Sequence, residues 1–239
     1  MFFFGLRKSV HGELFVETVD CWSKFVILAF FVLYLPRMRL KPPKILRRLM
    51  PDLIWEIEDE EGIFLTFDDG PTPGVTEWVL SMLDKYDAKA TFFVLGKNVE
   101  MYPDLYQKIL DAGHKVGNHT YSHQKGWKMS LERYTEDIDF ANDLIHSELF
   151  RPPYAQIKPT QARFLAQRYK LVMWDVVSRD YNRHLSPKTC LNNVIKYLDP
   201  GTIVVFHDSE KAFRNMRYAL PRTLEAIREK GLKCKAIEL

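Results

Sequence analysis

The chain has 239 residues, of which 46% are hydrophobic and 27% charged, and its formal net charge is +3. This length holds one substantial core or at most two small ones, and the composition is ordinary for a soluble globular enzyme. The weak net charge gives no reason to expect a nucleic-acid partner. Three cysteines, Cys21, Cys190 and Cys234, are too scattered for a disulfide framework and lack metal-ligand spacing.

The first 37 residues differ from the rest of the chain. Residues 25–35 are uninterrupted apolar sequence, which is shorter than the roughly 17–25 residues of a membrane-spanning helix. No small residues suited to signal-peptide cleavage follow, since the chain continues as Tyr34-Leu35-Pro36-Arg37. Four interpretations stay open: a short membrane-dipping anchor, an uncleaved signal-like segment, a packing helix, or residues that precede a true start at Met38. We expect this segment to take no part in the chemistry.

Residues 38–59 have the composition of a linker that is rich in proline and charge. A basic cluster spans its start: Arg37, Arg39, Lys41, Lys44, Arg47 and Arg48. Such a cluster suits a solvated linker, which we favour, or a contact with nucleic acid or with an anionic membrane surface. We therefore expect a location in the cytoplasm or at the periphery of the membrane, with any weak membrane association made through residues 21–48.

From about residue 60 the pattern becomes regular. Stretches with helical spacing separate seven runs that predict strands, near residues 63–67, 90–94, 114–118, 148–151, 171–177, 202–206 and 233–237. Ser130 and Ser186-Pro187 read as helix starts, and Gly231 ends a last helix near residues 222–230. This alternation predicts parallel strands joined by helical crossovers, in a barrel or a doubly wound sheet, as a single α/β catalytic domain over residues 60–239.

Reactive side chains follow the ends of the predicted strands. They are Asp68 and Asp69 after the first strand, His119 and His123 after the third, Arg151 after the fourth, Asp180 after the fifth and His207 after the sixth. Barrel enzymes assemble their active sites from the carboxyl ends of parallel strands. The sequence therefore predicts that these side chains converge on one rim.

The pair His119-Thr-Tyr-Ser-His123 has metal-ligand spacing. On one helical turn both imidazoles would point the same way. Together with Asp69 they would form a site of two nitrogens and one oxygen that leaves one position open, which is typical of catalytic zinc. Considered as a lone pair, the two histidines could equally be hydrogen-bonded surface or core residues.

Five stretches in chain order resemble the motifs of the polysaccharide deacetylases, also called carbohydrate esterase family 4 or the NodB homology domain. They are Thr66-Phe-Asp-Asp-Gly-Pro71, His119-Thr-Tyr-Ser-His123, Arg151-Pro-Pro-Tyr154, the stretch from Trp174 to Tyr181, and Val205-Phe-His207. The resemblance covers about residues 60–239. It implies a distorted (β/α)7 barrel and the metal-dependent hydrolysis of an N-acetyl group from an amino sugar of a polysaccharide or oligosaccharide.

The resemblance also implies a role for individual residues. Asp69, His119 and His123 would hold a divalent metal, with zinc expected first and cobalt, nickel or manganese as alternatives. Asp68 would be the general base toward the attacking water. His207 would be the general acid that protonates the leaving amine.

The third motif would support the base and the substrate. Arg151 would orient Asp68 and favour its anionic form. The backbone amide of Tyr154 would help to stabilise the oxyanion. Pro153 and Tyr154 would form one wall of the substrate groove.

The fourth motif departs from the family pattern. Many members read Asp-x-x-Asp-Trp where this chain has Val177-Ser-Arg-Asp180-Tyr181. Asp180 would pair with His207 and raise its pKa, which would make it a usable acid near neutral pH. Tyr181 would offer an aromatic wall to a sugar ring in place of tryptophan.

The sequence thus predicts a monomeric N-deacetylase with an N-acylated glycan as substrate and no nucleic-acid partner. Two alternatives stay open: a deformylase of a lipid-linked formamido sugar, and a catalytically silent carbohydrate-binding protein on the same fold. All five residues for metal, base and acid are present, which counts against the silent protein. The glycan and the acyl group are not determined by the sequence.

Overall fold

The computed structural model describes residues 41–42 and 44–239. The predicted apolar segment, residues 25–35, lies outside the described residues. Among the helices within the described ranges, none is long and apolar enough to cross a membrane. These helices are α2 Lys44–Leu49, α3 Val75–Lys85, α4 Gly96–Met101, α5 Pro103–Asp111, α6 Leu131–Ile145, α7 Pro159–Leu165, α8 Pro187–Ile195 and α9 Glu210–Glu229.

One parallel sheet organises the domain. Its strands are β1 Leu53–Ile54, β2 Gly62–Asp68, β3 Thr91–Val94, β4 Lys115–Asn118, β5 Leu149–Phe150, β6 Lys170–Val172, β7 Val176–Val177, β8 Ile203–His207 and β9 Lys233–Cys234. They pair in the order β1-β6-β5-β4-β3-β2-β8-β7, and β9 pairs with the start of β2. Every residue of β2 is buried, as expected of a strand with covered faces in a parallel sheet.

One stretch of chain, residues 170–177, connects the two ends of the curled sheet in the distorted (β/α)7 barrel. Its first part, β6, pairs with β5, and its second part, β7, pairs with β8. The sequence predicts one strand here, but the strand breaks at residues 173–175, which we call the seam. There the amide of Met173 donates to the carbonyl of Ile54 in β1, whereas that of Asp175 donates to the carbonyl of Ile203, the first residue of β8. The break therefore lets one stretch serve both ends of the sheet.

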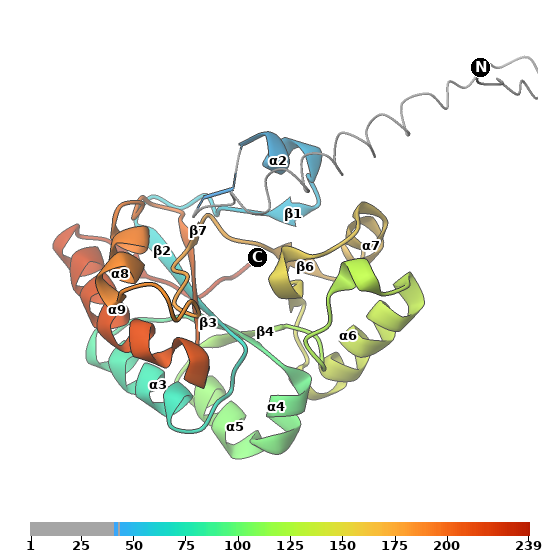
Figure 1. Ribbon diagram of the computed structural model, residues 1–239, viewed down its shortest axis with the longest axis horizontal. Helices are drawn as coiled ribbons and strands as arrows, with labels where there is room; N and C mark the ends of the chain where they lie inside the picture. Colours follow the sequence, from blue (N-terminus) through green and yellow to red (C-terminus); the bar gives the residue numbers. More distant parts are fainter. Residues whose placement is uncertain (1–40, 43) are drawn as a thin grey trace, which may run out of the picture. The chain divides into compact units, whose positions relative to one another are not determined.

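Two apolar layers fill the fold, and β2 contributes to both. Ile63, Leu65 and Phe67 belong to the layer between the sheet and the outer helices, which Figure 1 shows around the strands. Phe64 belongs to the second cluster, with Phe93 and Val172. Since side chains alternate along a strand, Thr66 and Asp68 share the inward face with Phe64. The alternation thus places Asp68 inside the barrel mouth.

The helix starts predicted at two serines are confirmed. Ser130 Oγ accepts from the Arg133 amide and Ser186 Oγ from the Thr189 amide. The last helix was predicted too short, since α9 begins at Glu210 and contains Pro221. A proline commonly stands in the first turn of a helix, but here buried positions continue across it: Met216, Ala219, Leu220 and Leu224.

A buried ion pair fastens the amino-terminal part of the described chain to the seam. The carboxylate of Asp175 is nearly inaccessible and pairs with Lys41, at 2.8 Å, and with Arg47 of α2. Arg47 also pairs with Glu56. α2 and β1 consequently cover the seam from one side (Figure 1).

We predict that Asp175→Asn lowers the free energy of unfolding by about 1–3 kcal/mol, because a hydrogen bond to a charged group is lost in a buried place. Urea unfolding measures the change. Asp139→Asn is the matched control, since Asp139 pairs with Arg168 at 2.7 Å on the surface, where such a pair contributes about 0–1 kcal/mol. Equal losses in the two variants would contradict a stabilising role for the seam pair.

Candidate active site

The two adjacent carboxylates at the end of β2 lie in different surroundings. Asp68 is buried on the inward face, whereas Asp69 follows the strand with φ 83° and is partly exposed. The carbonyl of Asp69 accepts a hydrogen bond of 2.8 Å from the Asn98 side chain, and that of Gly70 accepts one of 2.9 Å from the Leu95 amide. The start of α4 thus holds the turn in which Asp69 leaves the strand.

Gly70 occurs in this turn because no side chain fits there. A Cβ atom at this position would lie 2.0 Å from Oδ2 of Asp208. Asp208 is fully buried, and the hydroxyl of Thr76 lies 2.6 Å from the same oxygen. Burial, together with the nearby carboxylates of Asp69 and Asp68, raises the pKa of Asp208 to about 8. This side chain is therefore mostly protonated at neutral pH.

Asp69, His119 and His123 come together as a metal-ligand set. One ligand atom from each lies within 4.8 Å of the others. Oδ1 of Asp69 is 3.2 Å from His123 Nε2 and 3.8 Å from His119 Nε2, yet this buried oxygen has no hydrogen-bond partner. In a tetrahedral zinc site with bonds of about 2.0–2.2 Å, ligand atoms are roughly 3.3 Å apart. An unpartnered oxygen facing two imidazole nitrogens at such spacing fits a divalent cation.

The protonation of Asp69 and His119 also suits a cation. Burial raises the pKa of Asp69, but the approach of His123 and the charges of His207 and His119 outweigh it, so the pKa lies well below its ordinary value. Burial lowers the pKa of His119 to about 4. Nδ1 of His119 lies 2.7 Å from the carbonyl of Arg151. Because a carbonyl accepts only, Nδ1 carries the proton and Nε2 keeps its lone pair for a ligand role.

The expectation that one helical turn presents both imidazoles is wrong. Residues 119–123 form a loop, with positive φ at Thr120 and His123. One carboxylate of α6 organises this loop: Asp137 accepts from the amides of Tyr121 and Ser122, each at 3.2 Å, and from the Ser122 hydroxyl at 2.6 Å. The orientation of the histidines therefore depends on α6.

Sequence reasoning missed the polar residues that hold the motifs in place. Asp137 and Asn98 belong to no motif, and Asn118 serves by accepting from the Thr120 amide at 2.8 Å. The one local signal for Asp137 is a carboxylate next to Ile138, on the buried face of a predicted helix. That signal does not identify the loop that the acid binds.

Arg151 and Asp68 form a fully buried ion pair. The guanidinium donates to Asp68 Oδ1 and to the Thr66 hydroxyl, each at 2.7 Å, and lies 4.0 Å from the ring centroid of Phe93. It also donates to the carbonyl of Val172, at 3.1 Å, and to that of Met173 in the seam, at 2.7 Å. Burial lowers the pKa of Arg151, but a guanidinium stays charged in proteins. Arg151 thus compensates the charge of Asp68 through Oδ1 and leaves Oδ2 without a hydrogen bond from the guanidinium.

His207 lies opposite Asp68 in the register of β2 and β8, and its side chain pairs with Asp180. Nδ1 of His207 lies 2.8 Å from Asp180 Oδ1, and the His207 amide donates to Oδ2 at 2.8 Å. Burial lowers the pKa of His207, but the charge and hydrogen bond of Asp180 outweigh it and raise the pKa to about 9. The imidazole is therefore protonated on both ring nitrogens and positively charged at neutral pH. The ring of Tyr181 lies 5.0 Å from it, edge to face.

Tyr154 borders the cluster on the side of His123. The ring of Tyr154 is about half exposed and lies 4.6 Å from that of His123. Its backbone has φ 58°, whereas Pro153 is buried. In the same turn the amides of Ala155 and Gln156 donate to Pro152 and Pro153, and no hydrogen bond of the described backbone uses the Tyr154 amide. That N–H is therefore available to a ligand.

Comparison with known proteins agrees with these motifs. The family model described as polysaccharide deacetylase matches residues 56–174. Two relatives are peptidoglycan-N-acetylglucosamine deacetylases of Bacillus cereus. One is 31% identical over 179 residues, which cover 72% of this chain and 65% of that protein, so this chain spans less than two thirds of its length. The other is 32% identical over 188 residues, which cover 75% of this chain and 88% of that protein.

The fold agrees as well. A crystal structure of a peptidoglycan N-acetylglucosamine deacetylase in complex with 4-naphthalen-1-yl-N-oxidanyl-benzamide superposes with a TM-score of 0.76. It is 27% identical, and the match covers 82% of this chain and 95% of that one. The same distorted barrel, the family match and the motifs at its strand ends lead to one conclusion: this chain belongs to the polysaccharide deacetylase family, carbohydrate esterase family 4.

Proposed function

We propose that this protein is a metal-dependent hydrolase that removes the N-acetyl group from an amino sugar within a glycan. The observation that carries the proposal is that one ligand set and two ion pairs lie together at one barrel mouth. Asp69 faces two histidines, Asp68 is paired with Arg151, and His207 is paired with Asp180. A ligand set, a compensated carboxylate and a charged imidazole are the groups that amide hydrolysis by water requires.

In this proposal the ligand set holds the metal. A divalent metal bound by Asp69, His119 and His123 supplies a Lewis acid for the acetyl carbonyl and lowers the pKa of water. Zinc suits two imidazoles and a carboxylate, as do cobalt, nickel and manganese. Asp137 and the Arg151 carbonyl hold the two histidines in place from outside the set.

The paired residues move the protons. Asp68, held by Arg151, accepts a proton from the attacking water. The free amide N–H of Tyr154 donates to the oxygen that gains charge as the carbonyl carbon becomes tetrahedral. His207 then gives its proton to the amine nitrogen as the C–N bond breaks, which releases acetate and the free amino sugar. A pKa of about 9 keeps His207 protonated for this step at neutral pH.

A catalytically silent glycan-binding protein is the competing assignment. A Bacillus anthracis protein of this fold, 25% identical with a TM-score of 0.68, is a pseudoenzyme of carbohydrate esterase family 4, so membership alone does not establish turnover. The complete ligand set and both paired residues support the enzyme. Deformylation uses the same groups, and acetate or formate release distinguishes the two reactions.

We predict that the purified protein holds about one divalent ion per chain and releases acetate from N-acetylglucosamine oligomers or peptidoglycan. Dialysis against a chelator should abolish this release, and zinc or cobalt should restore it, because Asp69, His119 and His123 leave a position open for the substrate. Elemental analysis and acetate assays measure both quantities. Full activity in metal-free protein would contradict the mechanism.

Asp68→Asn should reduce kcat by about 10²–10⁴-fold, which is the usual contribution of a general base, and should leave the metal content unchanged. The asparagine still accepts a hydrogen bond from Arg151 but takes no proton. Asp69→Asn is the matched comparison, and it should lose metal as well as activity. If Asp68→Asn also loses its metal, the roles of the two carboxylates are reversed.

Activity should fall as the pH rises through about 9, because His207 loses there the proton that it donates. Asp180→Asn removes the charge that raises this pKa, so the alkaline limb of the kcat profile should move toward the ordinary histidine value of about 6.5. The measurement is kcat against pH for the two proteins. An alkaline limb that stays in place in Asp180→Asn would show that another group sets it.

A further inference from the structure

Positive charge without a carboxylate partner collects around the proposed active site. The loops 119–130, 151–158 and 178–186 directly follow β4, β5 and β7. These loops contain a single carboxylate, Asp180, which is paired with His207. Besides Arg151, which pairs with Asp68, their cationic side chains form no ion pair with any described residue: Lys125, Lys128, Lys158, Arg179 and Arg183. One of them, Lys158, donates to the Met129 carbonyl at 2.6 Å. The loops thus carry more positive charge than the whole chain, whose net charge is +3.

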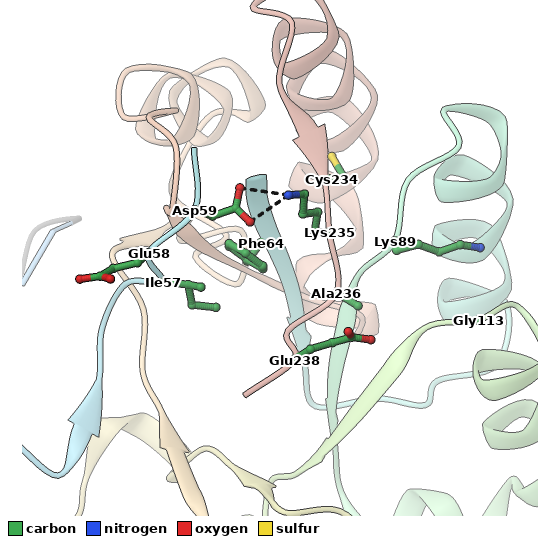
Figure 2. Close-up of a pocket in the computed structure, with 10 residues that line it drawn as sticks. All are labelled: Ile57, Glu58, Asp59, Phe64, Lys89, Gly113, Cys234, Lys235, Ala236 and Glu238. Carbon is green, nitrogen blue, oxygen red and sulfur yellow. Dashed lines mark hydrogen bonds and ion pairs between the residues drawn. The ribbon is translucent and has the colours of Figure 1, made fainter. Parts of the chain in front are cut away.

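The opposite end of the barrel has its charges satisfied within the protein. A pocket of about 430 Å³ lies there, beside the start of β2, and Figure 2 shows Asp59 and Lys235 paired within it. Lys235 lies 2.9 Å from Asp59 and 3.4 Å from Glu61, and Lys89 donates to the Ala112 carbonyl at 2.8 Å. An anion would have to compete with these partners. Apart from Arg151, the loop cations at the active end form no such ion pairs with the described residues.

Lys125 lies next to the ligand side of the site. Its ammonium is 4.6 Å from the ring centroid of Tyr154, and that ring is 4.6 Å from the ring of His123. A lysine over an aromatic ring keeps its charge and its three donors. Lys125 is therefore placed one aromatic ring away from a proposed metal ligand.

Lys211, at the start of α9, has the corresponding position on the other side of β2. Its ammonium is 5.6 Å from the ring centroid of Tyr181, and that ring is 5.0 Å from the ring of His207. β4, which precedes the loop of Lys125, and β8, which precedes Lys211, lie on opposite sides of β2 in the sheet. Two ammonium groups thus flank the carboxylates at the end of β2.

We propose that Lys125 and Lys211 bind carboxylates on the sugars that adjoin the N-acetylated sugar, so that the enzyme prefers an anionic glycan over a neutral one. Neither ammonium group forms an ion pair with a described carboxylate. Each lies over a tyrosine of the three loops, whose net positive charge attracts anions. The carboxylates could come from lactyl ether substituents or from uronic acids. This inference rests on the proposed function, because it assigns the neighbours of the sugar that is deacetylated.

The test compares an N-acetylated oligosaccharide that carries carboxylates with the same oligosaccharide after conversion of the carboxylates to methyl amides. One pair carries lactyl ether carboxylates and a second pair carries uronic acids, which distinguishes the two sources. Wild-type protein should show a lower KM for the carboxylate form, and added salt should reduce the difference. Lys125→Gln and Lys211→Gln should each raise this KM about two- to five-fold, as expected for one exposed charge pair, without changing kcat or the KM of the amide form.

Matched controls separate binding from general effects of charge and folding. Lys85→Gln removes an exposed lysine that lies 5.8 Å from the ring of Tyr86, at the opposite end of the barrel, and should change nothing. Lys125→Arg keeps the charge and should retain the low KM. Equal KM values for the two forms in wild type, or the same loss in Lys85→Gln, would overturn the proposal.

A binding measurement keeps the proposal independent of turnover. Calorimetric titration of the metal-loaded Asp68→Asn variant with both forms should give tighter binding of the carboxylate form, and Lys125→Gln or Lys211→Gln on that background should weaken it. If no glycan is deacetylated but this preference is measured, the proposed function fails and the assignment of the lysines stands. Equal affinities for the two forms overturn the assignment, whatever the activity.

Discussion

The contacts of Arg151 connect the parts on which this structure depends. Its guanidinium compensates the charge of Asp68 and donates to the carbonyls of Val172 and of Met173 in the seam, and its own carbonyl fixes the tautomer of His119. A buried guanidinium is stable only with its donors satisfied, so the barrel must close for the arginine to be accommodated. The base, one ligand and the barrel closure are therefore parts of a single arrangement.

Much of this arrangement could be predicted from the sequence because it follows from local patterns. The apolar run of β2, which ends in Asp68 and Asp69, and the serine caps of α6 and α8 are signals that depend on near neighbours. Their order along the chain placed the reactive side chains at one rim. The roles of those side chains remain predictions, but the structure brings the predicted ligands within 4.8 Å of one another.

What the sequence could not provide depends on contacts between distant segments. Asp137 reads as a helix-surface acid until α6 packs beside residues 121–122. The break at residues 173–175 requires β1 and β8 as competing partners for one apolar run. The loop conformation of His119 and His123 likewise depends on α6 rather than on their spacing. Hydrophobic periodicity contains no information about such polar contacts.

The position of β2 in the sheet has a consequence for synthesis of the chain. Among the described residues it is the first long strand made, yet two of its partners, β8 and β9, come from the last part of the chain. Asp68 and His207 are opposite each other in that late pairing. A growing or truncated chain without β8 presents one edge of β2, an apolar strand whose unpaired backbone groups can join another chain. Assembly of the proposed catalytic pair and protection of that edge are therefore the same event, and both await the carboxyl-terminal residues.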